Sequence, residues 1–171
     1  LYGKPVVVDE CKYEGDIPYR WGNIPAEELV RKFWEATVRG GYCGHGETYL
    51  HPEDTLWWSK GGVLHGESWQ RIAFLREILG GGPPEGFEPH DGVVRSGFPC
   101  VGKGDIYLLT YFGIQQPAIV PLSLPANRTY GATLLDTWEM TEGSLEGSFA
   151  GDCEIRIPAK PYQALLLRAD R

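Results

Sequence analysis

The chain has 171 residues, of which 42% are hydrophobic, and a formal net charge of −7. This composition is typical of a globular protein with one sizeable domain or two small ones. The acidic balance argues against a nucleic-acid partner, because phosphate binding requires clustered Lys and Arg; no hydrophobic run is long enough to cross a membrane.

The cysteine pattern gives no sign of a metal site. Cys11, Cys43, Cys100 and Cys153 form no CxxC pair and fit no zinc spacing. We therefore expect free buried thiols, with a Cys11–Cys43 or Cys100–Cys153 disulfide as an unsupported alternative. We expect neither a metal nor another cofactor.

A buried strand is predicted close to the start of the chain. The run Val6-Val7-Val8 indicates a strand covered on both faces, which is typical of parallel sheets. It ends in Asp9 and Glu10, and α/β folds build their sites at the carboxyl ends of such strands. Glu10 is therefore the leading candidate for chemistry; the alternative is a structural ion pair at an ordinary strand end. Because the chain begins almost directly with this strand, we expect it to be part of a larger protein.

The next elements predict one βαβ unit over residues 4–44. A loop over 15–23 leads to a helix with Asn23 near its start, Pro25 suited to its first turn, and an apolar stripe from Leu29 to Val38. The segment 41–49 is then predicted to form a second parallel strand, joined by a right-handed crossover. Its polar end, from His45 to Tyr49, is expected to lie beside Glu10.

A long loop and a second helix follow. The loop over 50–67 contains Trp57, Trp58 and two histidines, which favour a functional segment. Ser68 is predicted to cap a helix that Gly80 ends. Two αβ units do not make a stable domain, so residues 1–80 require further strands from outside the chain.

The pattern changes after the glycine- and proline-rich segment 80–86. Short aromatic or β-branched segments separated by turns predict an antiparallel β-sandwich. Its aromatic residues Tyr107, Tyr111, Phe112 and Trp138 are expected in its core. The predicted strand segments are 105–113, 117–124, 130–139, 144–149, 153–157 and 162–168.

This order of elements resembles the C-terminal third of a retaining glycoside hydrolase of the clan A type. Pro5-Val6-Val7-Val8-Asp9-Glu10 is similar to the signature of the seventh barrel strand, and the segments 13–15 and 41–49 are similar to apiosidase-like barrel families. The tail over residues 135–162 resembles the small β-sandwich that closes those enzymes. The resemblance implies an α/β plus all-β fold: the last two βα units of a (β/α)8 barrel over 1–82, a linker over 83–91, and an antiparallel β-sandwich over 92–171.

The resemblance makes Glu10 the nucleophile, while the acid/base on strand four has no counterpart in this chain. Retaining hydrolysis needs two carboxyl groups about 5 Å apart. Glu47 is less plausible as this second carboxyl group, because it would lie next to the nucleophile and not across the cleft. It is instead expected to hydrogen-bond sugar hydroxyls, with an ion pair at the barrel rim as the alternative. Tyr13 is the predicted hydrogen-bond donor beside Glu10. Trp57 and Trp58 are predicted to form a sugar platform, with one of the two rings facing the cleft, and His45 and His65 are predicted to bind sugar hydroxyls. The irregular spacing of His45, Glu47, His51 and His65 disfavours a metal site.

Three hypotheses follow for the function. The first is part of a glycosidase that acts on a glycoside or oligosaccharide and needs the remainder of the barrel as its partner, so that the chain alone is inactive. The second is a non-catalytic carbohydrate-binding or assembly module, which a Glu10 buried against the sandwich would favour. The third is a two-chain or domain-swapped assembly that covers the exposed strand edges.

Overall fold

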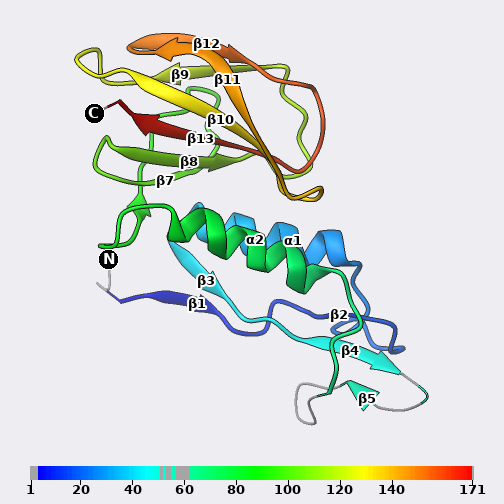
Figure 1. Cartoon of the computed structure of the whole chain (residues 1–171). Helices are drawn as coiled ribbons and strands as arrows, with labels where there is room; N and C mark the ends of the chain where they lie inside the picture. Colours follow the sequence, from blue (N-terminus) through cyan, green and yellow to red (C-terminus); the bar gives the residue numbers. More distant parts are fainter. Residues whose placement is uncertain (1–3, 51, 53–54, 57–61, 171) are drawn as a thin grey trace.

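The computed structural model describes residues 4–50, 52, 55–56 and 62–170 of the chain. The elements are stacked in layers (Figure 1), with the N-terminal strands on one side, two helices in the middle, and the antiparallel strands of the C-terminal half on the other side. The helices therefore contact strands on both sides.

The first layer contains a parallel strand pair. β1 (Val6–Val8) and β3 (Gly41–Cys43) pair in parallel and are joined through α1 (Ala26–Thr37), which confirms the predicted strand–helix–strand order. The predicted burial of the valines is wrong: Val6, Val7 and Val8 are 65%, 59% and 42% exposed. Within the described residues β1 pairs only with β3, so its other edge has no neighbour.

Helix α1 follows the predicted pattern closely. Pro25 is its N-cap residue, and Glu27 and Glu28 occupy its first turn, where the helix dipole favours negative charge. The apolar stripe faces the core as its 3.6-residue period requires. The buried residues are Ala26, Leu29, Val30, Phe33, Trp34 and Val38.

Helix α2 (Ser68–Gly80) begins differently from the prediction. Glu67 is the N-cap residue, and no side chain of the cap bonds to the helix, so the prediction that Ser68 caps it is wrong. Ser68 is instead the first helical residue. The helix buries Phe74, Leu75 and Ile78.

A three-stranded sheet lies beyond the ends of β1 and β3. β2 (Glu14–Gly15) pairs in parallel with β4 (Glu47–Leu50), and β4 pairs antiparallel with β5 (Thr55–Leu56). The two chain segments that start as β1 and β3 thus remain side by side after those strands end. The prediction of one uninterrupted loop over 50–67 is wrong at β5.

The second half of the chain forms a six-stranded antiparallel sheet in the order β11-β10-β13-β8-β7-β6. One face packs on the helices: Tyr107, Leu109 and Leu166 share a buried cluster with α1 and α2. The sheet strands are β6 (Glu88–Pro89), β7 (Cys100–Lys103), β8 (Tyr107–Tyr111), β10 (Tyr130–Asp136), β11 (Thr141–Phe149) and β13 (Gln163–Ala169).

A two-stranded ribbon covers the other face of this sheet. β9 (Ile119–Ser123) and β12 (Asp152–Arg156) pair antiparallel, and their residues Val120, Leu122 and Ile155 pack with Leu165 and Leu167 of β13. Each strand segment predicted after residue 104 contains a strand, whereas β6 and β7 were not predicted.

The remaining expectations concern aromatic and cysteine residues. Tyr107, Tyr111 and Phe112 are buried as predicted, and Trp138 packs partly buried beside Arg71. All four cysteines are free thiols. Neither helix in the described part of the chain is long and apolar enough to span a membrane.

Candidate active site

Glu10 lies at the carboxyl end of β1, exposed to solvent. The neighbouring segment stays paired one residue beyond β3, because the Gly44 N–H donates to the Val8 carbonyl at 3.0 Å. A Cβ on Gly44 would lie 2.6 Å from the carbonyl oxygen of Asp9, so a side chain there would push the two segments apart. The glycine therefore fixes the backbone immediately before Glu10.

Tyr13 is the predicted site residue that is electrostatically coupled to Glu10. Its ring packs directly on Gly46, where an added Cβ would lie 2.7 Å from Cδ1. Desolvation raises the pKa of the Tyr13 hydroxyl, and the negative charges of Glu10 and Asp9 raise it further. The hydroxyl therefore stays protonated at neutral pH and can donate a hydrogen bond.

Two buried glutamates face each other across β2 and β4. Glu14 and Glu47 are opposite in the parallel register, and they are 2% and 3% exposed. Two carboxyl groups this deeply buried need strong hydrogen-bond donors. The segment 65–68, which leads into α2, supplies them as backbone N–H groups.

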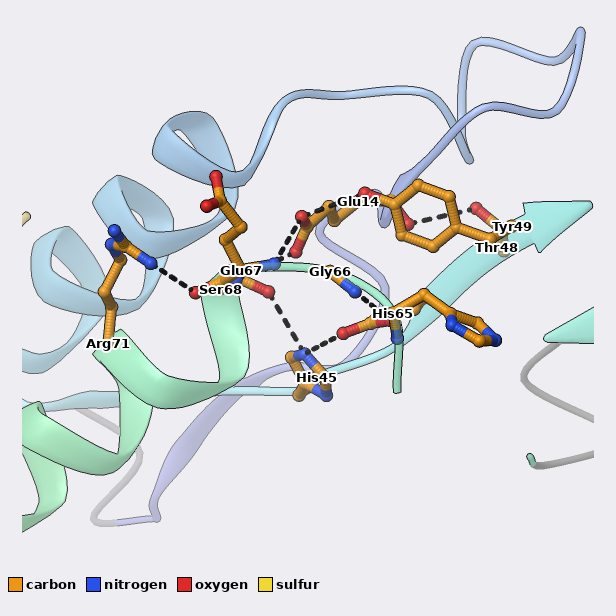
Figure 2. Close-up of polar contacts among 10 residues, drawn as sticks. Glu14, His45, Thr48, Tyr49, His65, Gly66, Glu67, Ser68 and Arg71 are labelled. Atoms are coloured by element: carbon orange, nitrogen blue, oxygen red, sulfur yellow. Dashed lines mark hydrogen bonds and ion pairs between the residues drawn. The ribbon is translucent and has the colours of Figure 1, made fainter. Parts of the chain in front are cut away.

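Glu14 binds the start of α2 (Figure 2). Its carboxylate accepts hydrogen bonds from the N–H groups of Glu67 at 2.9 Å and Ser68 at 3.0 Å, and from the Tyr49 hydroxyl at 2.9 Å. The first N–H groups of a helix have no partner within it, and the helix dipole favours a negative charge at this end. Glu14 therefore performs the capping that the helix's own residues do not.

Glu47 holds the residues immediately before the helix. One carboxylate oxygen, Oε2, accepts hydrogen bonds from the N–H groups of His65 and Gly66, both at 2.9 Å. The other oxygen, Oε1, is buried, has no hydrogen-bond partner among the described residues, and lies 3.9 Å from Nε2 of His45. Glu47 is thus bound chiefly to backbone.

His45 lies between these groups and the helix. Its Nε2 is 3.2 Å from the hydroxyl oxygen of Ser68, and its ring packs edge-on against Phe33. Burial lowers the pKa of His45 and outweighs the opposing effect of the Glu47 and Glu14 charges. The imidazole is therefore neutral at pH 7, so Nε2 either donates its N–H to the Ser68 hydroxyl oxygen or accepts a hydrogen bond from that hydroxyl, depending on the tautomer.

The structure places the predicted residues in three groups. Tyr13 is coupled to Glu10, whereas His45, Glu47 and the backbone of His65 belong to the cluster at the start of α2. His65 itself is exposed. Trp57 and Trp58 lie outside the described residues, as does His51. Within the described residues, no three His, Cys, Asp or Glu side chains are arranged to hold a metal ion.

Sequence reasoning missed Glu14, the most strongly bound carboxylate of the cluster. One signal was available: α2 has no acidic residue in its first turn. A helix with no capping side chain and no acidic residue in its first turn requires partners from elsewhere for its first N–H groups. The acidic residues nearest the two predicted strand ends were candidates for that role.

Comparison with known proteins connects this arrangement with glycoside hydrolases. A family model described as a domain of unknown function, DUF5605, matches residues 97–168. No curated protein sequence matches the chain. A candidate glycoside hydrolase from Bacteroides vulgatus has a similar structure, with a TM-score of 0.85 and 29% identity over 98% of this chain and 36% of that one.

Two further solved structures share the fold at lower identity. A glycoside hydrolase family 5 protein from Bacteroides vulgatus has a TM-score of 0.73 and 16% identity, covering 96% of this chain and 41% of that one. Another glycoside hydrolase has a TM-score of 0.69 and 13% identity, covering 98% of this chain and 42% of that one. The chain therefore spans less than half the length of these proteins, and its structural neighbours are glycoside hydrolases.

Proposed function

We propose that this chain is the nucleophile-bearing part of a retaining glycoside hydrolase, with Glu10 as the nucleophile. Residues 1–82 would complete a (β/α)8 barrel of the apiosidase-like type, 83–91 would link it to the rest, and 92–171 would form a closing β-sandwich. The single observation that carries the proposal is the similarity to a candidate glycoside hydrolase over 98% of this chain, with Glu10 exposed at the end of a parallel strand.

The proposed reaction uses two carboxyl groups. The Glu10 carboxylate attacks the anomeric carbon of the glycoside as the bond from that carbon to the leaving oxygen breaks. An acid/base from the remainder of the barrel protonates the leaving oxygen and then takes a proton from the water that hydrolyses the glycosyl ester. The Tyr13 hydroxyl, whose pKa is raised by desolvation and by the charge of Glu10, stays protonated and would donate a hydrogen bond to Glu10 or to a sugar oxygen.

We propose that Glu14 and Glu47 act by positioning rather than by touching sugar. The Glu47 side chain is fully buried and bonds two backbone N–H groups, which supports the structural alternative over direct sugar binding. His45 and His65 remain candidates for contact with sugar hydroxyls, and Trp57 and Trp58 for the sugar platform. The cluster would fix the segment 62–68 that follows the two tryptophans.

The competing hypothesis of a non-catalytic module has less support. That hypothesis predicts a Glu10 covered by the antiparallel sheet, whereas Glu10 is exposed and closely follows β1, which lies on the far side of the helices from that sheet (Figure 1). The exposed edge of β1 also supports a requirement for neighbouring strands, which the remainder of the barrel would supply.

The test is the Glu10→Gln variant of the intact protein that contains this chain, assayed on a panel of aryl glycosides. We expect turnover to fall by at least about a thousandfold, because the amide is not a nucleophile. Asp9→Asn is the matched control, one residue away on the same strand end, and is expected to stay within about tenfold of the parent. Near-normal turnover by Glu10→Gln, with unchanged folding, would remove Glu10 from the mechanism.

A further inference from the structure

An exposed pair of aromatic rings lies on the loop between β2 and α1. The rings of Tyr19 and Trp21 are nearly parallel, with an angle of 9° between their planes and 6.2 Å between their centroids. Tyr19 is 55% exposed and Trp21 is 37% exposed. We call these two residues the aromatic shelf.

The shelf is built on a rigid turn. The Gly22 N–H donates to the Tyr19 carbonyl at 2.9 Å, and the Tyr13 N–H donates to the Trp21 carbonyl at 2.8 Å. The Thr48 hydroxyl donates to the Gly22 carbonyl at 2.7 Å, which ties the turn to β4. An aromatic ring whose backbone is already fixed loses little entropy when a ligand binds to its exposed face.

Close packing beneath the turn also holds its backbone in place. Ile17 is 1% exposed and anchors the loop in the interior. A Cβ on Gly22 would lie 2.5 Å from the Thr48 hydroxyl oxygen and 2.6 Å from Cδ1 of Ile17, so only glycine fits there. The two exposed rings therefore stand on a well-packed base.

Tyr13 connects the shelf to the candidate nucleophile. The Tyr13 and Trp21 rings meet edge-to-face, with centroids 6.2 Å apart and planes at 90°. The charge of Glu10 acts on the same Tyr13 hydroxyl. Tyr13 thus contacts the shelf and lies close enough to Glu10 for the charge of Glu10 to act on its hydroxyl.

The chemistry of the shelf fits a sugar. The apolar C–H face of a pyranose packs on an aromatic ring while its hydroxyls remain in contact with water or polar groups. The exposed neighbours Arg20 and Asn23 are polar and can bond hydroxyls. A protein partner would favour a wider apolar patch than two rings bordered by polar residues.

We infer that the aromatic shelf binds a pyranose unit of an oligosaccharide, at a position separate from the bond that is cleaved. This inference deepens the proposed function and rests on it for the identity of the reaction. The shelf contributes affinity for longer substrates and no chemistry.

The test compares Tyr19→Ala with Tyr19→Phe in the intact protein. The probes are xylo-, cello- and manno-oligosaccharides of several units, and aryl monoglycosides as the short substrates. For the best-bound oligosaccharide we expect Tyr19→Ala to raise both Kd and KM about tenfold, as expected for losing one aromatic stacking contact. KM for the monoglycosides should change less than about twofold. Tyr19→Phe keeps the ring face and should behave as the parent.

A matched control removes an exposed apolar side chain elsewhere. Ile106 is 55% exposed in the turn between β7 and β8, and Ile106→Ala should change neither constant. Because Tyr19 is exposed, the urea unfolding transition of Tyr19→Ala should match that of the parent.

The outcomes separate this inference from the proposed function. If Tyr19→Ala leaves every Kd and KM within twofold, or if no oligosaccharide binds the parent, the shelf is not a sugar site, whatever Glu10→Gln does. If Tyr19→Ala weakens oligosaccharide binding while Glu10→Gln retains turnover, the shelf stands and the proposed nucleophile falls.

Discussion

Replacing Glu14 by glutamine tests whether a distant carboxylate holds the start of α2. In the parent, Oε1 of Glu14 accepts bonds from the Tyr49 hydroxyl and the Glu67 N–H, and Oε2 accepts one from the Ser68 N–H. The amide loses least when its oxygen takes the Oε1 position. The Ser68 N–H then faces an NH₂ group and has no acceptor.

The expected loss of stability follows from these contacts. A hydrogen bond to a charged group contributes about 1.5–3 kcal/mol, and removing the charge also loses about 0.5–1 kcal/mol of attraction to the helix dipole. We therefore expect Glu14→Gln to lower the free energy of unfolding by about 2–4 kcal/mol. Urea unfolding measures the total, and amide hydrogen exchange at Ser68 should show faster local opening.

The control is an exposed glutamate that has the same chemistry without the contacts. Glu146 on β11 is exposed, and Glu146→Gln is expected to change the unfolding free energy by less than about 0.5 kcal/mol. If Glu14→Gln resembled this control in both stability and hydrogen exchange at Ser68, the carboxylate would not be what holds the helix start.

Two further predictions concern the contact between Arg71 and Trp138 and the coupling between Cys11 and Cys43. The Arg71 guanidinium lies 3.7 Å from the ring centroid of Trp138. In urea unfolding, Trp138→Ala should therefore lower the free energy of unfolding by about 1–2 kcal/mol more than Trp138→Phe does. Equal losses of unfolding free energy would contradict a contribution from the cation–π contact. The side-chain hydrogen bond with Cys43 lowers the pKa of Cys11 to about 7. The rate of Cys11 alkylation by iodoacetamide should therefore rise with a midpoint near pH 7, and in Cys43→Ala the midpoint should move to a higher pH. An unchanged midpoint in that variant would refute the coupling. Because the folded-state pKa of Cys11 lies below its unfolded value, this group stabilises the fold above about pH 8.5, and that contribution is lost as the pH falls through 7.

Local periodicity made much of the fold predictable. From the sequence alone, the apolar stripe of α1 predicted that helix, and the short segments between turns predicted six of the antiparallel strands. Strand β7 was missed because Gly102 and Lys103 interrupt its apolar pattern, although Gly102 allows close approach to the Tyr107 carbonyl. Two-residue strands such as β2 have no period to detect.

Long-range partners account for the errors. Ser68 has the residue type of a helix cap, but the groups that bind its N–H come from Glu14, 54 residues earlier. The burial of Val6–Val8 was inferred from the unbroken run of apolar residues, whereas burial depends on neighbouring strands that the described residues do not include. The cluster of Glu14, Glu47 and His45 depends on tertiary pairing and has no short motif.

The measurement that most directly tests the central proposal is covalent trapping in the intact protein. A fluorosugar with fluoride as its leaving group, deactivated by a fluorine at the 2-position, should form a stable glycosyl ester, and fluoride should be released in equal amount. Peptide mapping by mass spectrometry should locate the sugar on Glu10. A label on another carboxylate, in a protein that hydrolyses the parent glycoside, would contradict the account.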